Sequence, residues 1–171
     1  MQIHKHVKHE FESLFDEDPR YLVRAPGRVN LIGEHTDYND GFVLPMAIDC
    51  AIWIAFRSRK DMKVRVYSLD LDQSGEFELD SLQKGKGWIE YIKGVAHELQ
   101  HAGYKLGGWE GALAGDIPRG AGLSSSAALE LAAARAFASV SSFEWRPVQM
   151  AKLAQQAENE WVGVKIGRAH V

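Results

Sequence analysis

Apolar and polar residues at the start of the chain alternate with the period of a helix. Apolar side chains recur every three or four positions from Ile3 to Phe15, which predicts an amphipathic helix that ends before the run "DEDPR". Three histidines lie among lysines on its polar face, at positions His4, His6 and His9. A metal site is the alternative to a solvated face, but no acidic or cysteine partner shares the histidine spacing, so we favour the solvated face.

The pattern changes to that of strands after residue 20. Runs rich in β-branched and aromatic residues, bounded by turn residues, are typical of strands. The runs that fit are Tyr21–Ala25, Arg28–Ile32, Phe42–Ile48, Ala51–Ser58 and Lys63–Leu69, with a short further strand at Glu76–Leu79.

The second half of the chain is mainly helical in pattern. An apolar stripe from Ile89 to Leu99 predicts one helix, and a short strand, "WEGALAGD", precedes a glycine-rich loop. Two more helices are expected within residues 123–140 and 146–163, the second with Pro147 in its first turn. Strands followed by helices, with one crossover at the glycine loop, predict an α+β fold.

Composition narrows the class of protein. The 171 residues are near the size of one domain, and 46% of them are hydrophobic, as in globular cores. A net charge of −3 lacks the basic footprint of a nucleic-acid binder, and no apolar run is long enough to span a membrane. The charged N-terminus does not resemble a signal peptide, and the single cysteine fits a reducing cytoplasm. We assign Cys50 and the five tryptophans to the core.

The glycine-rich loop "PRGAGLSSSAALE" has the features of a phosphate-binding loop without a Walker A lysine. Gly120 and Gly122 allow close approach of a ligand to the backbone, and Ser124 to Ser126 begin a helix, where serine satisfies free N–H groups. A helix N-terminus attracts phosphate, so backbone dipoles and a metal ion can replace the lysine. A serine hydroxyl can bind Mg²⁺, which also requires a carboxylate. A Gly/Ser linker is the alternative, disfavoured because the loop runs directly into an alanine-rich helix.

A polar cluster follows the predicted strand at Arg28–Ile32. Two carboxylates and an imidazole within four residues, at Glu34, His35 and Asp37, suit the binding of several hydroxyl groups of a polyol. A zinc site is one alternative, but the cluster lacks a second histidine at helical spacing and a cysteine partner. A hydrophilic surface hairpin is the other alternative. A hydroxyl-binding cluster and a phosphate loop in one domain together indicate a small-molecule kinase.

Three segments resemble a known family. "GRVNLIGEHTDYNDGFVLP" (27–45) is similar to the galactokinase signature, and "GAGLSSSAA" (120–128) resembles the ATP motif of the wider GHMP kinases. "QAENEWVGV" (156–164) resembles the segment before the catalytic aspartate of galactokinases. The resemblance implies an N-terminal lobe like ribosomal protein S5 domain 2, over residues 1–164, without the family's ferredoxin-like C-terminal lobe. Within it, the galactose-binding signature would span 20–45 and the ATP motif 115–137.

The resemblance also implies an activity: ATP-dependent phosphorylation of the C1 hydroxyl of α-D-galactose to galactose 1-phosphate, with Mg²⁺, by a cytoplasmic and monomeric parent protein. Arg28 would stabilise the transition state, and the sugar would be held by Glu34, His35, Thr36 and Asp37. Ser126 and Glu158 would bind Mg²⁺. The nucleotide would contact Ser68, Gly120, Ala121, Gly122, Leu123, Ser124, Ser125 and Ser126. A kinase for another sugar, such as N-acetylgalactosamine or arabinose, and a galactose and ATP sensor without catalysis are the alternatives.

The end of the chain departs from the family pattern. After "ENEWVGV" the family continues to its catalytic aspartate, whereas this chain reads "KIGRAHV", with His170 near the aspartate's place. The run "IGRAHV" matches the in-frame translation of a common sequencing adapter, so residues 165–171 are expected to be a non-native tail. The catalytic base is then expected to be missing, the fragment inactive, and part of its apolar surface uncovered.

Overall fold

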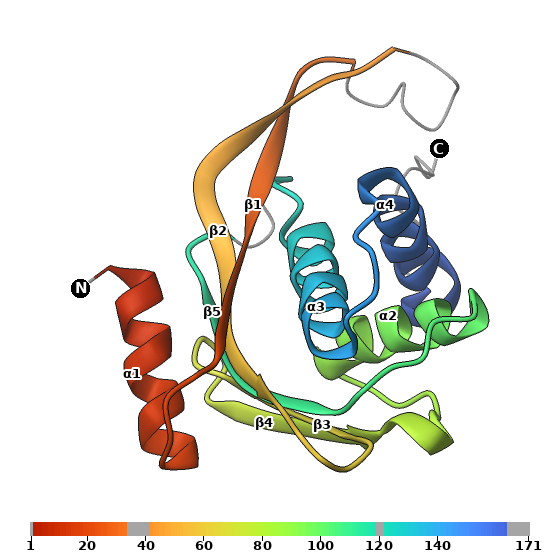
Figure 1. Cartoon of the computed structure of the whole chain (residues 1–171). Coiled ribbons are helices and arrows are strands. Elements are labelled where there is room, and N and C mark those ends of the chain that lie inside the picture. Colours follow the sequence, from red (N-terminus) through yellow and green to blue (C-terminus); the bar gives the residue numbers. More distant parts are fainter. Residues whose placement is uncertain (1, 34–41, 119–121, 164–171) are drawn as a thin grey trace.

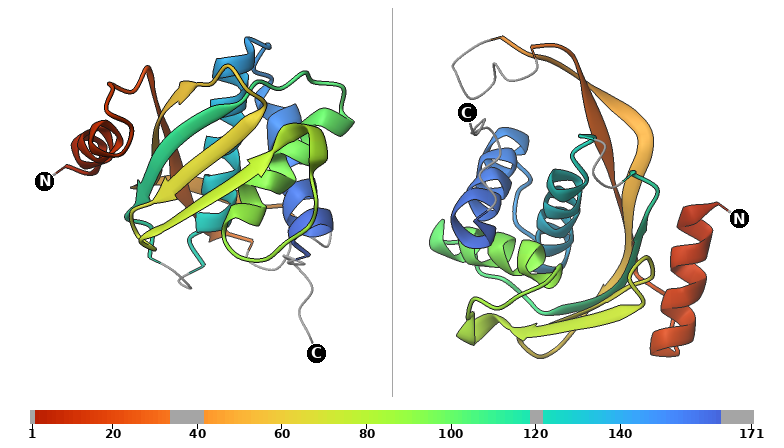
Figure 2. Two further views of the ribbon diagram at one scale, coloured as in Figure 1. Left: turned by 90° about the horizontal axis from the view of Figure 1, so that it is seen from below. Right: turned by 180° about the vertical axis from the view of Figure 1, so that it is seen from behind.

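The computed structural model describes residues 2–33, 42–118 and 122–163. A five-stranded sheet lies at its centre and curves around a layer of helices formed by α2 (Ile89–His101), α3 (Ser125–Ser141) and α4 (Pro147–Gln156) (Figure 1). Helix α1 (Ile3–Phe15) packs on the opposite face of the sheet, as both views of Figure 2 show. The predicted α+β class is therefore confirmed.

The sheet has the strand order β1-β2-β5-β3-β4. Strands β3 and β5 are parallel, and the other neighbouring pairs are antiparallel. The strands span β1 (Tyr21–Ile32), β2 (Leu44–Ser58), β3 (Lys63–Ser68), β4 (Gln73–Glu78) and β5 (Trp109–Gly115). Helix α2 makes the crossover that the parallel β3–β5 pair requires.

Two pairs of predicted strands prove to be single long strands, so the predicted breaks at 26–27 and 49–50 are wrong. Strand β1 runs through Pro26 because it lies at the edge of the sheet, where a missing N–H donor is tolerated. A register shift between Pro26 and Arg28 marks the irregularity in its pairing with β2. Strand β2 stays continuous because β1 pairs with it on either side of the predicted break, at Ala47 and Ala51, and β5 pairs with it from Ile52 onward.

The last predicted helix, over 146–163, has two parts. Regular α4 passes directly into a six-residue π-helical segment, η3 (Ala157–Val162), which Gly163 ends in a left-handed conformation. A short 3₁₀ turn, η2 (Leu79–Ser81), follows β4. A π-helical turn changes the direction in which side chains leave a helix, and such turns are frequent at functional sites.

The main core fills the space between the sheet and α2, α3 and α4. Trp109 stands edge-on to both Phe56 and Phe137, with ring centroids 5.7 Å apart in each pair. Buried alanines along α3 allow that helix to approach the sheet closely. A smaller cluster around Val7 and Phe11 seats α1 on the other face.

The assignment of Cys50 and all five tryptophans to the core is only partly right. Trp109 and Trp161 are buried, whereas Trp53, Trp88, Trp145 and Cys50 keep part of their surface exposed. At the far end of the β1–β2 hairpin, which extends beyond the helices in Figure 1, several large apolar side chains are exposed. They are Leu31, Ile32, Phe42, Leu44 and Met46. Among the described residues, no helix is long and apolar enough to cross a membrane.

Candidate functional site

The backbone N–H donors at the start of α3 have no side-chain cap. Gly122 and Ser124 both adopt left-handed conformations, with φ of 70° and 58°, and the helix begins at Ser125. The expectation that serine satisfies the free N–H groups fails at the N-cap, because the Ser124 side chain makes no capping hydrogen bond. Uncapped N–H groups and the positive end of the helix dipole suit this end for an anion.

Strand β1 is docked directly against the glycine loop. The Arg28 N–H donates a hydrogen bond to the Leu123 carbonyl oxygen over 3.1 Å. Gly27 makes this approach possible, because a Cβ at position 27 would lie 2.9 Å from that same oxygen. The contact fixes the Arg28 backbone beside the segment that leads into α3, although the two segments are far apart in the sequence.

Gly27→Ala should therefore disturb the backbone contact between β1 and Leu123. We expect the free energy of unfolding to fall by about 1–3 kcal/mol, as for other overpacked positions. Gly107→Ala is the matched control, because its added Cβ would meet only ordinary contacts at 3.9 Å. Urea denaturation of both variants measures the difference. Equal stability of the Gly27 and Gly107 variants would show that the docking contact is not tight.

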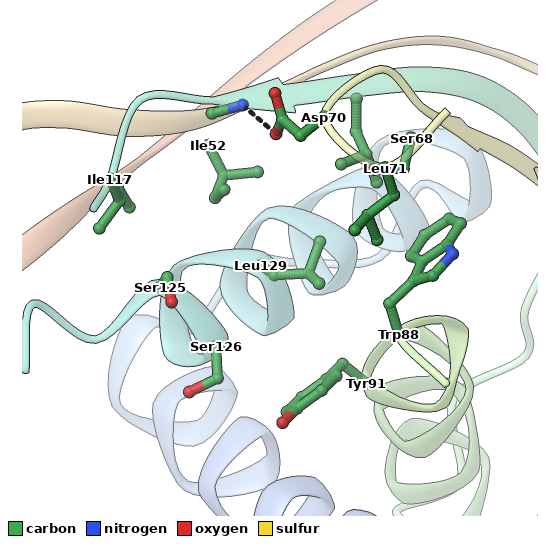
Figure 3. A pocket seen from close by; sticks show the side chains of 12 residues that line it. Ile52, Ser68, Asp70, Leu71, Trp88, Tyr91, Ile117, Ser125, Ser126 and Leu129 are labelled. Carbon is green, nitrogen blue, oxygen red and sulfur yellow. Dashed lines mark hydrogen bonds between the residues drawn. The ribbon is translucent and has the colours of Figure 1, made fainter. Parts of the chain in front are cut away.

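A cavity of about 530 Å³ opens beside the first turn of α3 (Figure 3). We call it the α2–α3 cavity. Its polar wall includes Ser125 and Ser126 from α3 and Ser68 from the end of β3. Its apolar wall includes Ile52, Leu113, Ile117 and Leu129. Three of the residues predicted to contact a nucleotide thus line one cavity, next to the anion-binding end of the helix.

Sequence reasoning missed the aromatic side of this cavity. Trp88 and Tyr91, from the start of α2, point into it from the side opposite the sheet (Figure 3). Asp70 and Leu71 follow β3, and the Asp70 carboxylate accepts a hydrogen bond from the Gly115 N–H over 2.9 Å. The spacing of Trp88 and Tyr91, three residues apart on one side of a predicted helix, was the only available signal.

A second cavity, of about 460 Å³, lies between α3 and α4. We call it the α3–α4 cavity. Arg28 lines it from β1, Glu130 from α3 and Glu158 from η3. Exposed Lys152 and Gln155, on α4, line its wall as well. The cavity thus combines two acidic side chains with two basic ones.

Glu158 connects this second cavity to the glycine loop. It is 3% exposed, and its carboxylate accepts a hydrogen bond from the Ser126 hydroxyl. Burial raises the pKa of Glu158, and the Ser126 hydrogen bond and the positive charge of Arg28 oppose that rise. The π-helical turn holds Glu158 in place, since its carbonyl oxygen accepts the N–H of Gly163 over 3.0 Å. Ser126 and Arg28, which come from two separate elements, therefore both act on Glu158.

Glu130 is the most unusual residue of the site and was not singled out from the sequence. It is completely buried, and neither carboxylate oxygen has a hydrogen-bond partner within the described part of the chain. Burial, with the negative charge of Glu158, raises the pKa of Glu130 to about 9. The pKa of the Tyr91 hydroxyl is raised as well, first by burial and then by the negative charges of Glu158 and Glu130. On an alanine-rich helix, this glutamate resembles a surface acid.

The oxygen atoms gathered here suit a hard cation such as Mg²⁺. Mg²⁺ prefers one or two carboxylates together with phosphate oxygens and water. Ser126 and Glu158 supply a hydroxyl and a carboxylate in mutual contact, and Glu130 adds unpartnered oxygens to the same cavity. No group of three or more His, Cys, Asp or Glu side chains is placed to hold a metal among the residues described. A cation at this site would therefore take further ligands from a bound phosphate.

Several predicted site residues lie outside the described residues. These are Glu34, His35, Thr36, Asp37, Gly120 and Ala121, together with the proposed tail over 165–171. The residues flanking the polar cluster are described: Ile32 pairs with Leu44 where β1 and β2 meet. Arg28 lies four residues before Ile32 on β1, where its N–H donates to the Leu123 carbonyl oxygen.

Comparison with known proteins places these features in a family. Residues 9–58 match the galactokinase galactose-binding signature, and residues 90–171 match the N-terminal domain of GHMP kinases. A galactokinase of Roseiflexus sp. strain RS-1 is 48% identical over 162 residues, which cover 94% of this chain and 41% of the relative. The galactokinase of Pyrococcus furiosus is 47% identical over 86% of the chain and 42% of its own length. The chain thus spans about two fifths of the curated relatives that it matches.

Solved structures agree with this similarity. The galactokinase of Lactococcus lactis, solved in complex with galactose, superimposes with a TM-score of 0.86 and 38% identity, over 94% of this chain and 43% of that one. Mevalonate kinase of Methanococcus jannaschii has a TM-score of 0.71 at 24% identity, over 85% of this chain and 49% of that one, and so shares the fold.

Proposed function

Because the chain belongs to the galactokinase family of GHMP kinases and matches their N-terminal part, we propose that it forms part of a sugar 1-kinase. The reaction is transfer of a phosphoryl group from ATP to the C1 hydroxyl of α-D-galactose, giving galactose 1-phosphate. Two features support galactose as the sugar: the match of residues 9–58 to the galactose-binding signature, and the likeness to a galactokinase solved with galactose. We also propose that the whole protein is a cytoplasmic monomer.

The observation that carries this proposal is the meeting of Arg28, Ser126 and Glu158 beside the free N-terminus of α3. Phosphoryl transfer needs little covalent chemistry from the protein. It depends on positioning the reacting groups and on stabilising the charge that spreads over the transferred phosphoryl. A guanidinium, a metal-binding pair and a row of backbone donors are the groups that such stabilisation uses.

The two cavities then have distinct roles. The nucleotide would lie in the α2–α3 cavity, with its base and ribose near Trp88 and Ser68. Its phosphates would accept hydrogen bonds from the first N–H groups of α3, on the segment from Gly120 to Ser126. The sugar would lie near the α3–α4 cavity, held by Glu34, His35, Thr36 and Asp37. Arg28, at the border of the two, would contact the phosphoryl group in transit.

Ser126 and Glu158 would hold Mg²⁺, which when bound neutralises part of the triphosphate charge. Arg28 adds a fixed positive charge on the side facing the sugar. The hydrogen bond from Ser126 and the charge of Arg28 both favour the ionised form of Glu158, despite its burial. Burial still raises the pKa of Glu158 overall, so a bound cation would add to these two influences in favour of the ionised carboxylate.

A chimera tests the proposed function. Residues 1–163 of this chain replace the corresponding part of the Roseiflexus galactokinase, which supplies the remaining length. We expect ATP turnover with galactose and a sugar 1-phosphate product, detected by ³¹P NMR, with lower turnover of N-acetylgalactosamine and arabinose. The unfused chain serves as the blank, because the family resemblance places the catalytic aspartate after Val164. Binding of galactose and ATP by the chimera without turnover would favour a sensor, and preference for another sugar would correct the substrate.

A further inference from the structure

Glu130 is a buried carboxylate that the fold itself does not explain. Its side chain is 0% exposed, and none of the described residues offers a hydrogen bond to either oxygen. A buried carboxylate without a partner costs several kcal/mol if it is ionised. Hydrophobic or amide side chains of similar volume would fill the same place on α3 without that cost. A carboxylate at this position therefore indicates a partner other than the described residues.

The position of Glu130 points to the nature of that partner. Residues four apart lie on one face of a helix, so Glu130 stands one turn below Ser126 on α3. Glu158 accepts a hydrogen bond from Ser126, and the negative charge of Glu158 acts on Glu130. Both glutamates line this cavity, so three oxygen-bearing side chains converge on one region.

The charges around Glu130 favour the binding of a cation. Burial and the negative charge of Glu158 raise the pKa of the Glu130 carboxyl, and neither Arg28 nor Lys152, which line the same cavity, opposes that rise. Arg28 acts on Glu158 and not on Glu130. A divalent cation between the two glutamates would satisfy both, and Mg²⁺ accepts one or two carboxylates together with phosphate oxygens.

We propose that Glu130 is a second carboxylate of the cation site, which binds the divalent ion together with Ser126 and Glu158. The inference rests on the proposed function, because the cation is the one that accompanies ATP. In the absence of metal, Glu130 is buried without a hydrogen-bond partner among the described residues, which weakens the fold. When the ion is bound, both carboxylates face a common positive charge, so metal binding is tighter than Ser126 and Glu158 alone would give.

Manganese binding to the 171-residue chain tests this inference without any turnover assay. Mn²⁺ is titrated alone, and free Mn²⁺ is measured by electron paramagnetic resonance. Glu130→Gln should raise the Kd for Mn²⁺ at least about tenfold, the range seen when groups around a metal are removed. Glu160→Gln is the matched control: this exposed glutamate lies in the same π-helical segment as Glu158, and its loss should leave Kd unchanged.

Thermal unfolding without metal separates a metal role from a structural one. A buried, unpartnered carboxylate is destabilising, so Glu130→Gln should unfold at the same temperature as the unmodified chain or higher. A structural role predicts the opposite result, a lower unfolding temperature with an unchanged Kd. Glu130→Met, which fills the same volume without polar atoms, repeats both measurements if the glutamine variant does not fold.

The outcomes distinguish this inference from the proposed function. Weaker Mn²⁺ binding in both Glu130→Gln and Glu158→Gln supports it. Weaker binding in Glu158→Gln alone overturns the role of Glu130 and leaves the proposed kinase site intact. No Mn²⁺ binding by the unmodified chain, or no effect of either variant, overturns the inference together with the metal site of the proposed function.

Discussion

Replacing Arg28 with alanine in the chimera is expected to lower kcat by about 10³-fold. Removing a single preorganised donor to a developing charge costs about 10²–10³ in kcat, and arginines that contact a transferred phosphoryl contribute as much or more. Arg28 is also the basic group that acts on Glu158, so its loss leaves the acidic pair without that compensation. KM for ATP should change much less than kcat, because the nucleotide is held mainly in the α2–α3 cavity.

Two further variants make the Arg28 measurement specific. Arg28→Lys keeps the positive charge but lacks the planar guanidinium with its paired N–H donors. Its kcat should fall between that of Arg28→Ala and that of the chimera with Arg28. Arg24→Ala, on the same strand, removes an exposed arginine that instead hydrogen-bonds the Asp49 carbonyl oxygen. Its kcat should stay close to that of the chimera. If Arg28→Ala kept kcat within about threefold, a role of Arg28 in phosphoryl transfer would be rejected.

Glu158→Gln is expected to raise the Mg²⁺ concentration needed for half-maximal turnover by about 100-fold. The glutamine keeps the volume and can still accept the Ser126 hydrogen bond, but it lacks the negative charge that binds a hard cation. Groups around a metal typically contribute 10–100-fold to its affinity, so about 100-fold suits a direct ligand. Turnover measured across a Mg²⁺ series gives the value. An unchanged Mg²⁺ titration, beside an equally unchanged Glu160→Gln control, would remove Glu158 from the metal site.

Much of the architecture followed from periodicity. The helices at Ile3–Phe15 and Ile89–His101 appeared where apolar spacing predicted them, because each buries an apolar stripe, α1 against the sheet and α2 mainly against α3 and η3. The strand breaks at 26–27 and 49–50 were wrong because pairing with neighbouring strands holds the chain extended regardless of local composition. β-Strand propensity describes a segment by itself, whereas the hydrogen bonds between strands depend on partner strands that are far away in the sequence.

The site was only partly predictable, for a similar reason. Arg28, Ser126 and Glu158 were assigned together through family resemblance, and nothing in their spacing shows that they meet. Glu130 escaped notice because burial, and not residue type, makes a carboxylate on a helix unusual. Trp88 was assigned to the core because a large apolar side chain at the start of a helix gives no sign that it borders a cavity.

The most direct test of the account is a crystal structure of the chimera with galactose, Mg²⁺ and a non-hydrolysable ATP analogue. We expect the triphosphate against the first turn of α3, the metal between Ser126 and Glu158, and the Arg28 guanidinium within hydrogen-bond distance of the terminal phosphate. The base should lie in the α2–α3 cavity beside Trp88. A triphosphate bound elsewhere, or an Arg28 side chain directed away from both substrates, would contradict the proposed arrangement.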